Sequence, residues 1–498
     1  MTVAMREKVL IGVILVAGVL LRPPGLFLAP DDAAGLVTAD QVWSGLRAYE
    51  AAPTPRPIVS LGAFMLLAQL PRSVWTMQAA NLLLSLLIEL AVFAAAKKLW
   101  GRRGGIAAMA TAMALLLTPW AGSVSVVLPV ALLAIGAALG VTALEAKRET
   151  CACLVASGLV LGLAVGASVD VTMSAAAVVF GAWLWIRALP RVAMPGTFVL
   201  AVAGTAAAGW IVGGPAYFTC LQRGLDYYMG DVTGRYASEA LLHSIELFLG
   251  QPAPLIALGV AGVLALRQAP AQARAMAPTL AAWLVGAILD ANWGRRYEAG
   301  SWMPLLPVLA MGAGAFVGVG KRSPEPDRGK PLVLAVVLLA LVLLVPRAKV
   351  AMGHYRDIFS TTPVVAVDTE IADSMLRAGG PGATMFVWAD NQSAAAYCQA
   401  QVVPPDPYMA YRLAGYWRTA EKTEKRETHD WDSFGQLLKS AKPQWIVLQT
   451  DGDFEKLFPW WSYETLAAIV EQNYSLFLEA PGRTVYRQKT IGVTSPKR

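Results

Sequence analysis

Residues 74–120 read VWTMQAANLLLSLLIELAVFAAAKKLWGRRGGIAAMATAMALLLTPW. This stretch contains two apolar runs, 74–96 and 105–120, with a short turn rich in lysine and arginine between them. An α-helix needs about 20 predominantly apolar residues to cross the hydrocarbon core of a bilayer. Basic residues collect in the cytoplasmic loops of membrane proteins. The stretch therefore predicts two transmembrane helices joined on the cytoplasmic side.

Apolar runs of this kind continue to about residue 347. Of the 498 residues, 56% are hydrophobic and only 15% are charged, whereas soluble globular domains average roughly a quarter charged residues. We predict a polytopic α-helical membrane protein with about eleven transmembrane helices. Their expected ranges are 8–28, 74–96, 105–120, 124–145, 151–169, 171–187, 196–214, 242–266, 276–291, 302–320 and 331–347.

The distribution of charge predicts the orientation. Residues 347–498 hold 17 basic and 17 acidic residues, so the net charge of +7 belongs to the residues before them. With a cytoplasmic N-terminus, 16 of the 24 earlier basic residues fall in cytoplasmic segments, as the positive-inside rule expects. An odd number of spans then places the C-terminus outside the cytoplasm. We expect a multi-pass protein of the cytoplasmic (inner) membrane, and no basic stripe indicates binding to nucleic acid.

The sequence predicts two domains, a transmembrane domain over 1–347 and an extracytoplasmic α/β domain over 348–498. Four segments of the second domain have the composition of strands: Thr384–Trp388, Trp445–Gln449, Ser475–Ala480 and Thr484–Gln488. The last two flank Pro481-Gly482-Arg483, which indicates a hairpin. Trp460, Trp461 and Tyr463 are candidates for a face that contacts the membrane or an acceptor, with burial in the core as the alternative.

Three predicted external segments are long enough to build a site, namely 29–73, 215–241 and 292–301. The first of them contains the apolar stretch Ile58–Leu70. That stretch is too short to span a bilayer, so we expect it to lie along the membrane interface.

Four groups of short motifs resemble a known family. They are Pro30-Asp31-Asp32-Ala33; Asn81–Leu84 leading to Ala94–Arg102; Arg295-Arg296-Tyr297 followed by Met303–Pro307; and Pro443–Leu448 with Asn473-Tyr474 and Val485–Arg487. Together they resemble the GT-C glycosyltransferases that use polyprenyl-phosphate sugars. The bacterial relatives of the protein O-mannosyltransferases and of the aminoarabinose transferase acting on lipid A are the most similar.

The resemblance implies a membrane glycosyltransferase with an inverting mechanism. It would move a sugar from a polyprenyl-phosphate donor to a hydroxyl of a lipid, glycan or protein at the outer face of the membrane. No cofactor is implied. A divalent metal is not indicated either, because the four cysteines and three histidines show no metal-binding spacing.

Asp31 and Asp32 are the candidate catalytic residues. The phosphate leaving group is weakly basic and needs no general acid, whereas the acceptor hydroxyl needs a base. A carboxylate just beyond the first helix is placed for that role at the outer interface. The alternative is structural, because an aspartate is a favoured N-cap for a helix that starts at Ala33.

Arg295 and Arg296 are candidates for binding the donor phosphate, because a guanidinium grips phosphate oxygens with two N–H groups. Anchoring at the interface by snorkelling is the alternative. Weaker candidates for the phosphate are Arg47 and Arg235.

Three tyrosines, Tyr227, Tyr228 and Tyr236, are candidates for an acceptor cleft. Their alternative is an aromatic belt, which any membrane interface favours.

Some features depart from the family pattern. The turn Ala121–Ser125 lacks the second acidic residue that the family often carries, and Arg56-Pro57-Ile58 stands where Pro-Pro-Leu is usual. These departures favour a second hypothesis, a non-catalytic membrane scaffold. A transporter is a third hypothesis, but the apolar spans of a transporter would carry paired ionisable residues. In the predicted spans of this chain Glu89 stands nearly alone, and we expect it to form a hydrogen bond inside the bundle.

Overall fold

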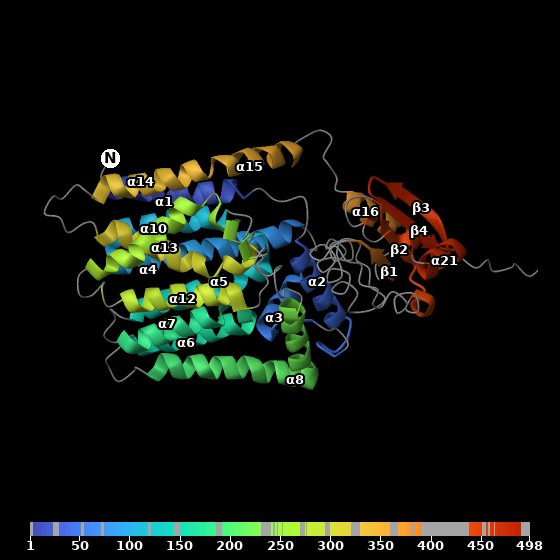
Figure 1. Ribbon diagram of the computed structural model, residues 1–498, viewed down its shortest axis with the longest axis horizontal. Coiled ribbons are helices and arrows are strands. Elements are labelled where there is room, and N and C mark those ends of the chain that lie inside the picture. Colours follow the sequence, from blue (N-terminus) through green and yellow to red (C-terminus); the bar gives the residue numbers. More distant parts are fainter. Residues whose placement is uncertain are drawn as a thin grey trace, which may run out of the picture. The chain divides into compact units, whose positions relative to one another are not determined.

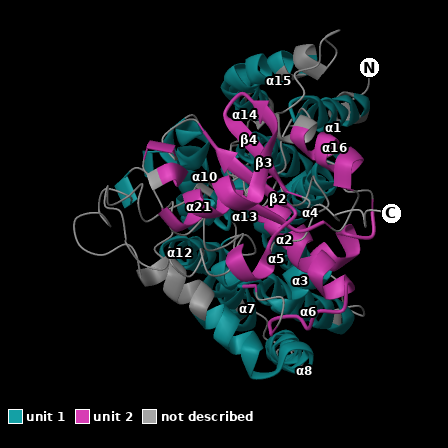
Figure 2. Cartoon of the chain, turned by 90° about the vertical axis from the view of Figure 1, so that its right-hand side faces the viewer, with its two compact units in different colours: residues 1–25, 55–63, 75–363 teal, residues 26–54, 64–74, 364–498 magenta. Residues whose placement is uncertain are grey.

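The computed structural model describes most of the chain. It covers residues 3–489 except for 23–28, 51–53, 71–73, 118–120, 144–149, 186–191, 231–240, 243–244, 247, 251, 269–273, 275, 294–298, 320–328, 359–366, 380–382, 390–437, 451–454, 457–458 and 463. Two compact units emerge, which Figure 2 colours separately. Unit 1 comprises Met1–Gly25, Pro55–Ala63 and Trp75–Pro363, and unit 2 comprises Leu26–Thr54, Phe64–Val74 and Val364–Arg498.

Unit 1 is a helical bundle. Most of its long helices lie side by side with roughly parallel axes (Figure 1). They are α1 (Val3–Leu20), α4 (Val74–Leu116), α5 (Val124–Ala143), α6 (Thr150–Ala167), α7 (Thr172–Trp185), α8 (Ala193–Gly230), α10 (Ala253–Ala265), α12 (Ala277–Trp293), α13 (Leu305–Val319), α14 (Gly329–Leu343) and α15 (Val345–Ile358). Short 3-10 turns are η2 (Val169–Val171), η4 (Leu266–Gln268) and η5 (Ala299–Trp302).

Each predicted span contains a helix, but fewer of these helices are long and apolar enough to be identified as transmembrane. Within the described residues, three helices are long and apolar enough to cross a membrane: Trp75–Leu116, Val124–Ala143 and Ala193–Gln222. A fourth crossing is the pair Leu332–Leu343 and Val345–Gly353, which is bent by 41°. Six shorter apolar helices accompany them. The chain is therefore of the multi-pass type, while the number eleven stays a prediction.

Helix α4 contains both runs of the stretch 74–120. Its helical geometry is interrupted at Gly101, where φ is 75° and ψ is 176°. A positive φ strains any residue with a Cβ atom, so glycine is suited to this position. The break falls inside the basic turn, which agrees with two helices that meet there.

Several predicted boundaries are wrong. The first helix ends at Leu20 and not at residue 28. The seventh predicted span, 196–214, continues as α8 to Gly230, where we predicted an external segment from 215 to 241. Gly214 adopts a φ of 56°, and Pro215 follows it at the start of the second part, a position that suits the fixed φ of proline. The ring of Tyr217 packs back against Gly209, so the second part of α8 contacts the first.

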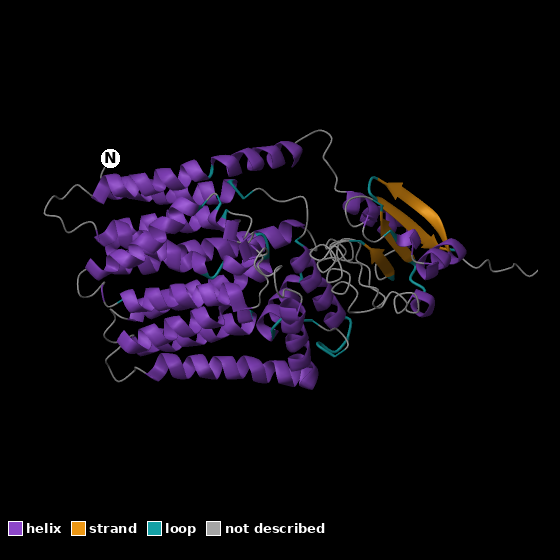
Figure 3. Ribbon diagram, in the orientation of Figure 1, coloured by secondary structure: helices purple, strands orange, loops and turns teal. Residues whose placement is uncertain are grey.

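Unit 2 contains a four-stranded sheet of order β1-β2-β4-β3, drawn in orange in Figure 3. Its strands are β1 (Met385–Trp388), β2 (Trp445–Gln449), β3 (Tyr474–Ala480) and β4 (Arg483–Gln488). The first two pair in parallel and the others are antiparallel. Further elements are α16 (Val367–Gly379), η7 (Trp460–Ser462), α21 (Glu464–Asn473) and, from the predicted external segment, α2 (Pro30–Trp43). Helix α3 (Ile58–Leu67) contributes residues to both units.

The α/β character and all four strands are confirmed, each within one residue of its predicted start and end. Trp388 and Trp445 are fully buried in the sheet. The hydroxyl of Tyr474 donates a hydrogen bond of 2.7 Å to the carbonyl of Pro443, and burial raises the pKa of this tyrosine to about 12. Helix α15 extends across the predicted domain boundary at 347/348, and that boundary stays a prediction.

Glycines bring α10 and α13 into backbone contact. A Cβ atom at Gly262 would overlap the carbonyl oxygen of Gly312, and one at Gly312 would overlap that of Gly259. At Gly259 an added Cβ would lie 2.6 Å from the carbonyl oxygen of Leu309. These two helices therefore touch at a distance that only glycine permits.

We expect Gly262→Ala to destabilise the bundle. The added methyl group must push two backbones apart, and overpacking of this kind costs roughly 1–3 kcal/mol. The control is Gly204→Ala on α8, where an added Cβ meets no atom within 4 Å. Thermal unfolding of the purified protein in detergent should show a lower Tm for Gly262→Ala alone. An equal Tm in both variants would contradict the close contact.

Candidate functional site

Asp31 and Asp32 lie inside the first turn of α2. The helix begins at Pro30, and Ala29 occupies the N-cap position. The alternative in which the two aspartates cap a helix starting at Ala33 is therefore wrong. Proline is favoured at the first position of a helix, because its missing N–H has no intrahelical partner there. Carboxylates in the first turn are stabilised by the positive end of the helix dipole.

The two carboxylates have different surroundings. Asp31 is exposed, whereas Asp32 is only 3% exposed. Residues 32–39 are all buried, so the helix is enclosed on every side over this part of its length. The ring of Phe64 lies against Gly35, where a Cβ would come within 2.7 Å of it. One carboxylate is thus accessible to a hydroxyl, and the other is buried.

Among the arginine candidates, the structure describes the side chain of Arg47. This side chain is 80% exposed, and its guanidinium pairs with Glu50 at 3.3 Å, so a phosphate would compete with that carboxylate. Four other candidate residues lie outside the described residues, namely Arg235, Tyr236, Arg295 and Arg296. Tyr227 and Tyr228 are in the second part of α8, but their side chains lie outside the described part as well. A contact of Asp31 or Asp32 with Arg295 or Arg296 stays a prediction.

The hydrogen bond predicted for Glu89 is confirmed, and its partner is Arg22. Arg22 Nη2 lies 3.0 Å from Glu89 Oε1, and the two side chains are 15% and 0% exposed. Sequence reasoning missed Arg22, which lies within the predicted first span. The rule that singled out Glu89 applies equally to a cation, since any charge inside a membrane is costly without a partner.

The pair is incompletely satisfied. Glu89 Oε2 and the Nε and Nη1 atoms of Arg22 are buried without a hydrogen-bond partner in the described structure. A Cβ added to Gly18 would lie 3.5 Å from Glu89 Oε1, so the backbone of α1 closes over the carboxylate. This ion pair joins α1 to α4 inside unit 1.

Asp290 is a second buried carboxylate that sequence reasoning missed, although it lies inside a predicted span. It accepts hydrogen bonds from the backbone N–H groups of Met173, at 2.9 Å, and Ser174, at 2.7 Å. These N–H groups belong to the first turn of α7, which has no intrahelical acceptors for them. Asp290 therefore caps α7 from α12 and has a structural role.

No protein-family model matches the sequence, and no curated protein matches it. The crystal structure of ArnT from Cupriavidus metallidurans bound to undecaprenyl phosphate is similar, with a TM-score of 0.60 and 15% identity over 98% of this chain and 99% of that one. The chain has the GT-C fold.

Two further GT-C structures support this assignment. An oligosaccharyltransferase from Archaeoglobus fulgidus matches with a TM-score of 0.53 and 13% identity over 96% of this chain and 73% of that one. The mycobacterial arabinofuranosyltransferase AftD matches with a TM-score of 0.52 and 15% identity. That match covers 98% of this chain and 40% of AftD. The resemblance read from short motifs is thus confirmed at the level of the fold.

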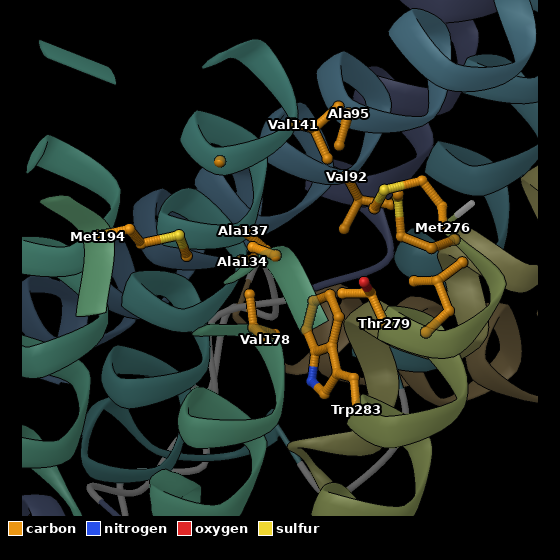
Figure 4. A pocket seen from close by; sticks show the side chains of 14 residues that line it. Val92, Ala95, Ala134, Ala137, Val141, Val178, Met194, Met276, Thr279 and Trp283 are labelled. Carbon is orange, nitrogen blue, oxygen red and sulfur yellow. The ribbon is translucent and has the colours of Figure 1, made fainter. Parts of the chain in front are cut away.

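An apolar cavity of about 30 Å³ lies within this GT-C bundle (Figure 4). Valine, alanine, leucine and methionine side chains of several helices surround it, and Thr279 and Trp283 of α12 add two polar atoms. Its lining residues include none that titrates, so the cavity cannot supply a base. Among the described residues, no group of three or more histidine, cysteine, aspartate or glutamate side chains is placed to hold a metal ion.

We expect Arg22→Met to destabilise unit 1 strongly. Removing one member of a buried ion pair leaves an uncompensated charge, which costs about 3–5 kcal/mol. The double variant Arg22→Met/Glu89→Met should recover much of this loss, because two apolar side chains of similar size can replace a buried pair. Thermal unfolding in detergent measures both.

The exposed pair supplies the control. Arg47→Ala should change stability by less than about 1 kcal/mol, because solvent screens the attraction between Arg47 and Glu50. If Arg22→Met unfolded at the same temperature as Arg47→Ala, the Arg22–Glu89 pair would not hold α1 to α4.

Proposed function

We propose that the chain is a membrane glycosyltransferase that takes its sugar from a polyprenyl-phosphate donor. The observation that carries this proposal is the match over 98% of this chain and 99% of ArnT, whose structure is bound to undecaprenyl phosphate. A second neighbour, archaeal AglB, is in complex with an inhibitory peptide and a dolichol-phosphate. The acceptor is a hydroxyl of a lipid, glycan or protein at the outer face of the inner membrane.

In the proposed reaction the acceptor oxygen attacks the anomeric carbon of the sugar from the face opposite the phosphate. The bond between that carbon and the phosphate oxygen breaks, and its electron pair leaves with the polyprenyl phosphate. A carboxylate takes the proton of the acceptor hydroxyl. Asp31 is the accessible candidate for this base, and Asp32, buried beside it, is the second. The attack inverts the anomeric configuration.

The donor phosphate requires cations or N–H groups around it. We assign this role to Arg295 and Arg296, with Arg47 and Arg235 as weaker candidates. Tyr227, Tyr228 and Tyr236 are proposed to line the acceptor cleft. These assignments rest on the sequence motifs and on the GT-C fold.

A non-catalytic scaffold is the second candidate function. The observation that favours it is the turn between α4 and α5, where the described residues Ala121–Ser125 carry no carboxylate. Instead Ser123 and Ser125 share a hydrogen bond of 3.0 Å between their hydroxyl groups. A scaffold with this fold would bind a lipid or a protein without transferring sugar.

We expect Asp31→Asn/Asp32→Asn to reduce transfer about 10²–10⁴-fold, which is the usual contribution of a positioned general base. Mass spectrometry of lipids, glycans and surface proteins from a deletion strain should first identify the product that is lost. The double variant should then fail to restore it, although it is expressed at the normal level.

The matched control is Asp40→Asn, which removes a carboxylate from the last turn of the same helix. This variant should restore the product. Restoration by the double variant would refute the proposed base. If the deletion strain retains all of its glycosylated lipids, glycans and surface proteins, the result would support the scaffold.

We also predict the orientation of the chain. A reporter enzyme that works only in the cytoplasm should be active when it is fused after Lys330. A reporter enzyme that works only outside the cytoplasm should be active when it is fused after Arg356. The physical reason is the excess of basic residues in the segments assigned to the cytoplasm. A cytoplasmic result for the fusion after Arg356 would overturn the odd number of spans.

A further inference from the structure

Unit 2 presents an aromatic surface on one face of the β3–β4 hairpin. Tyr486 and Thr484 are two residues apart on β4 and therefore point to the same side. Their partners on β3 are Leu476 and Glu479, and a β-bulge between Leu476 and Leu478 keeps both on that side. We call this set, together with the neighbouring Trp460 and Trp461, the hairpin face.

The aromatic rings of the hairpin face form a continuous group. The Trp460 ring lies 6.1 Å from the ring of Tyr486 and 6.2 Å from that of Trp461, measured between centroids. Trp461 is 53% exposed and Leu476 is 57% exposed. Trp460 therefore links a partly buried tyrosine to an accessible indole, and the alternative in which Trp461 is buried in the core is wrong.

Carboxylates border this aromatic group. Burial raises the pKa of Tyr486, and the negative charges of Glu479 and Glu471 raise it further, which places both carboxylates near the phenol. Glu479 and Glu471 are themselves exposed. The basic residues of β4, Arg483 and Arg487, alternate with Thr484 and Tyr486 and so point to the opposite side, where Arg487 stacks on Trp445 at 5.3 Å.

This combination selects against several partners. Exposed carboxylates repel anionic lipid headgroups and nucleic acids, and they are costly to bring to a membrane surface. Lys489 does not offset them on this face, because its Nζ binds the backbone carbonyls of Glu471 and Gln472 at 2.8 and 3.1 Å. A suitable ligand has flat apolar patches for the rings and several hydroxyl or amino donors for the carboxylates.

A saccharide has these properties. The axial C–H bonds of a pyranose form an apolar face that stacks on indole and phenol rings, while its hydroxyls donate hydrogen bonds to carboxylates. We infer that the hairpin face binds a saccharide without negative charge, through stacking on Trp461 and hydrogen bonds to Glu479. This inference stands on unit 2 alone and does not depend on the proposed transfer reaction.

The test uses the full chain in nanodiscs of phosphatidylcholine. Maltohexaose, cellohexaose, chitohexaose and its deacetylated form serve as probes, observed by saturation-transfer-difference NMR. At least one probe should receive saturation at its ring C–H protons. Trp461→Ala should abolish the effect, and Glu479→Gln should weaken the affinity about tenfold, which corresponds to 1.4 kcal/mol.

Two controls separate this site from others. Phe477→Ala removes an aromatic ring that packs against Trp445, at 4.8 Å between centroids, and should leave binding unchanged. Asp31→Asn should also bind normally, so a loss of transfer is distinguished from a loss at the hairpin face. Binding is compared only between variants whose Tm equals that of the unsubstituted protein.

Three results would overturn the inference. The first is that none of the four saccharides binds, and the second is that binding survives both Trp461→Ala and Glu479→Gln. The third concerns lipid. The fluorescence lost in Trp461→Phe is the emission of Trp461. If brominated phosphatidylcholine in the nanodisc quenches this emission, the hairpin face contacts the membrane and not a saccharide.

Discussion

Close contact between helix backbones at glycine holds unit 1 together. Helices within a bilayer gain little from the hydrophobic effect, because lipid tails are as apolar as their side chains, so van der Waals contact must hold them. Three glycines of α6, at every fourth residue, face short side chains of α8. Gly158 faces Thr197, Gly162 faces Ala201 and Gly166 faces Thr205. Between α10 and α13 the contact is glycine to glycine. These contacts set which helices are neighbours, and the positions of the charged residues follow from that order.

The charged side chains inside the bundle bind partners from other helices. Arg22 pairs with Glu89, and Asp290 binds the N–H groups that begin α7. Arg347 of α15 donates a hydrogen bond to the carbonyl of Leu117, at the end of α4. A charge inside a membrane is costly unless it is paired, and each of these contacts joins two helices. These residues therefore explain stability, and the chemistry is better sought at carboxylates outside the bundle core.

Sequence periodicity and composition predicted much of this fold, and its failures have physical causes. The strands were found because apolar β-branched and aromatic runs end at clear turn residues such as Pro481-Gly482. The second part of α8 was missed because Gly214-Pro215 has the composition of a turn, whereas packing of Tyr217 on Gly209 supports a helix there. Arg22 was missed because one cation in an apolar run does not reveal its partner, which lies 67 residues away. Lateral contacts of this kind depend on three-dimensional packing, and periodicity along the chain does not contain them.

The different surroundings of Asp31 and Asp32 give the proposed site its sharpest test. Residues 32–39 are enclosed, so a change at Asp32 acts on a buried carboxylate, while a change at Asp31 acts on an exposed one. A general base must be accessible to the acceptor, which favours Asp31. A positioning role suits Asp32, because a buried carboxylate keeps its orientation only through fixed partners. Loss of transfer in Asp31→Asn, set beside a smaller loss in Asp32→Asn at equal stability, would assign the two roles separately. The reverse pattern would place the base at Asp32 and require the start of α2 to open before the acceptor binds.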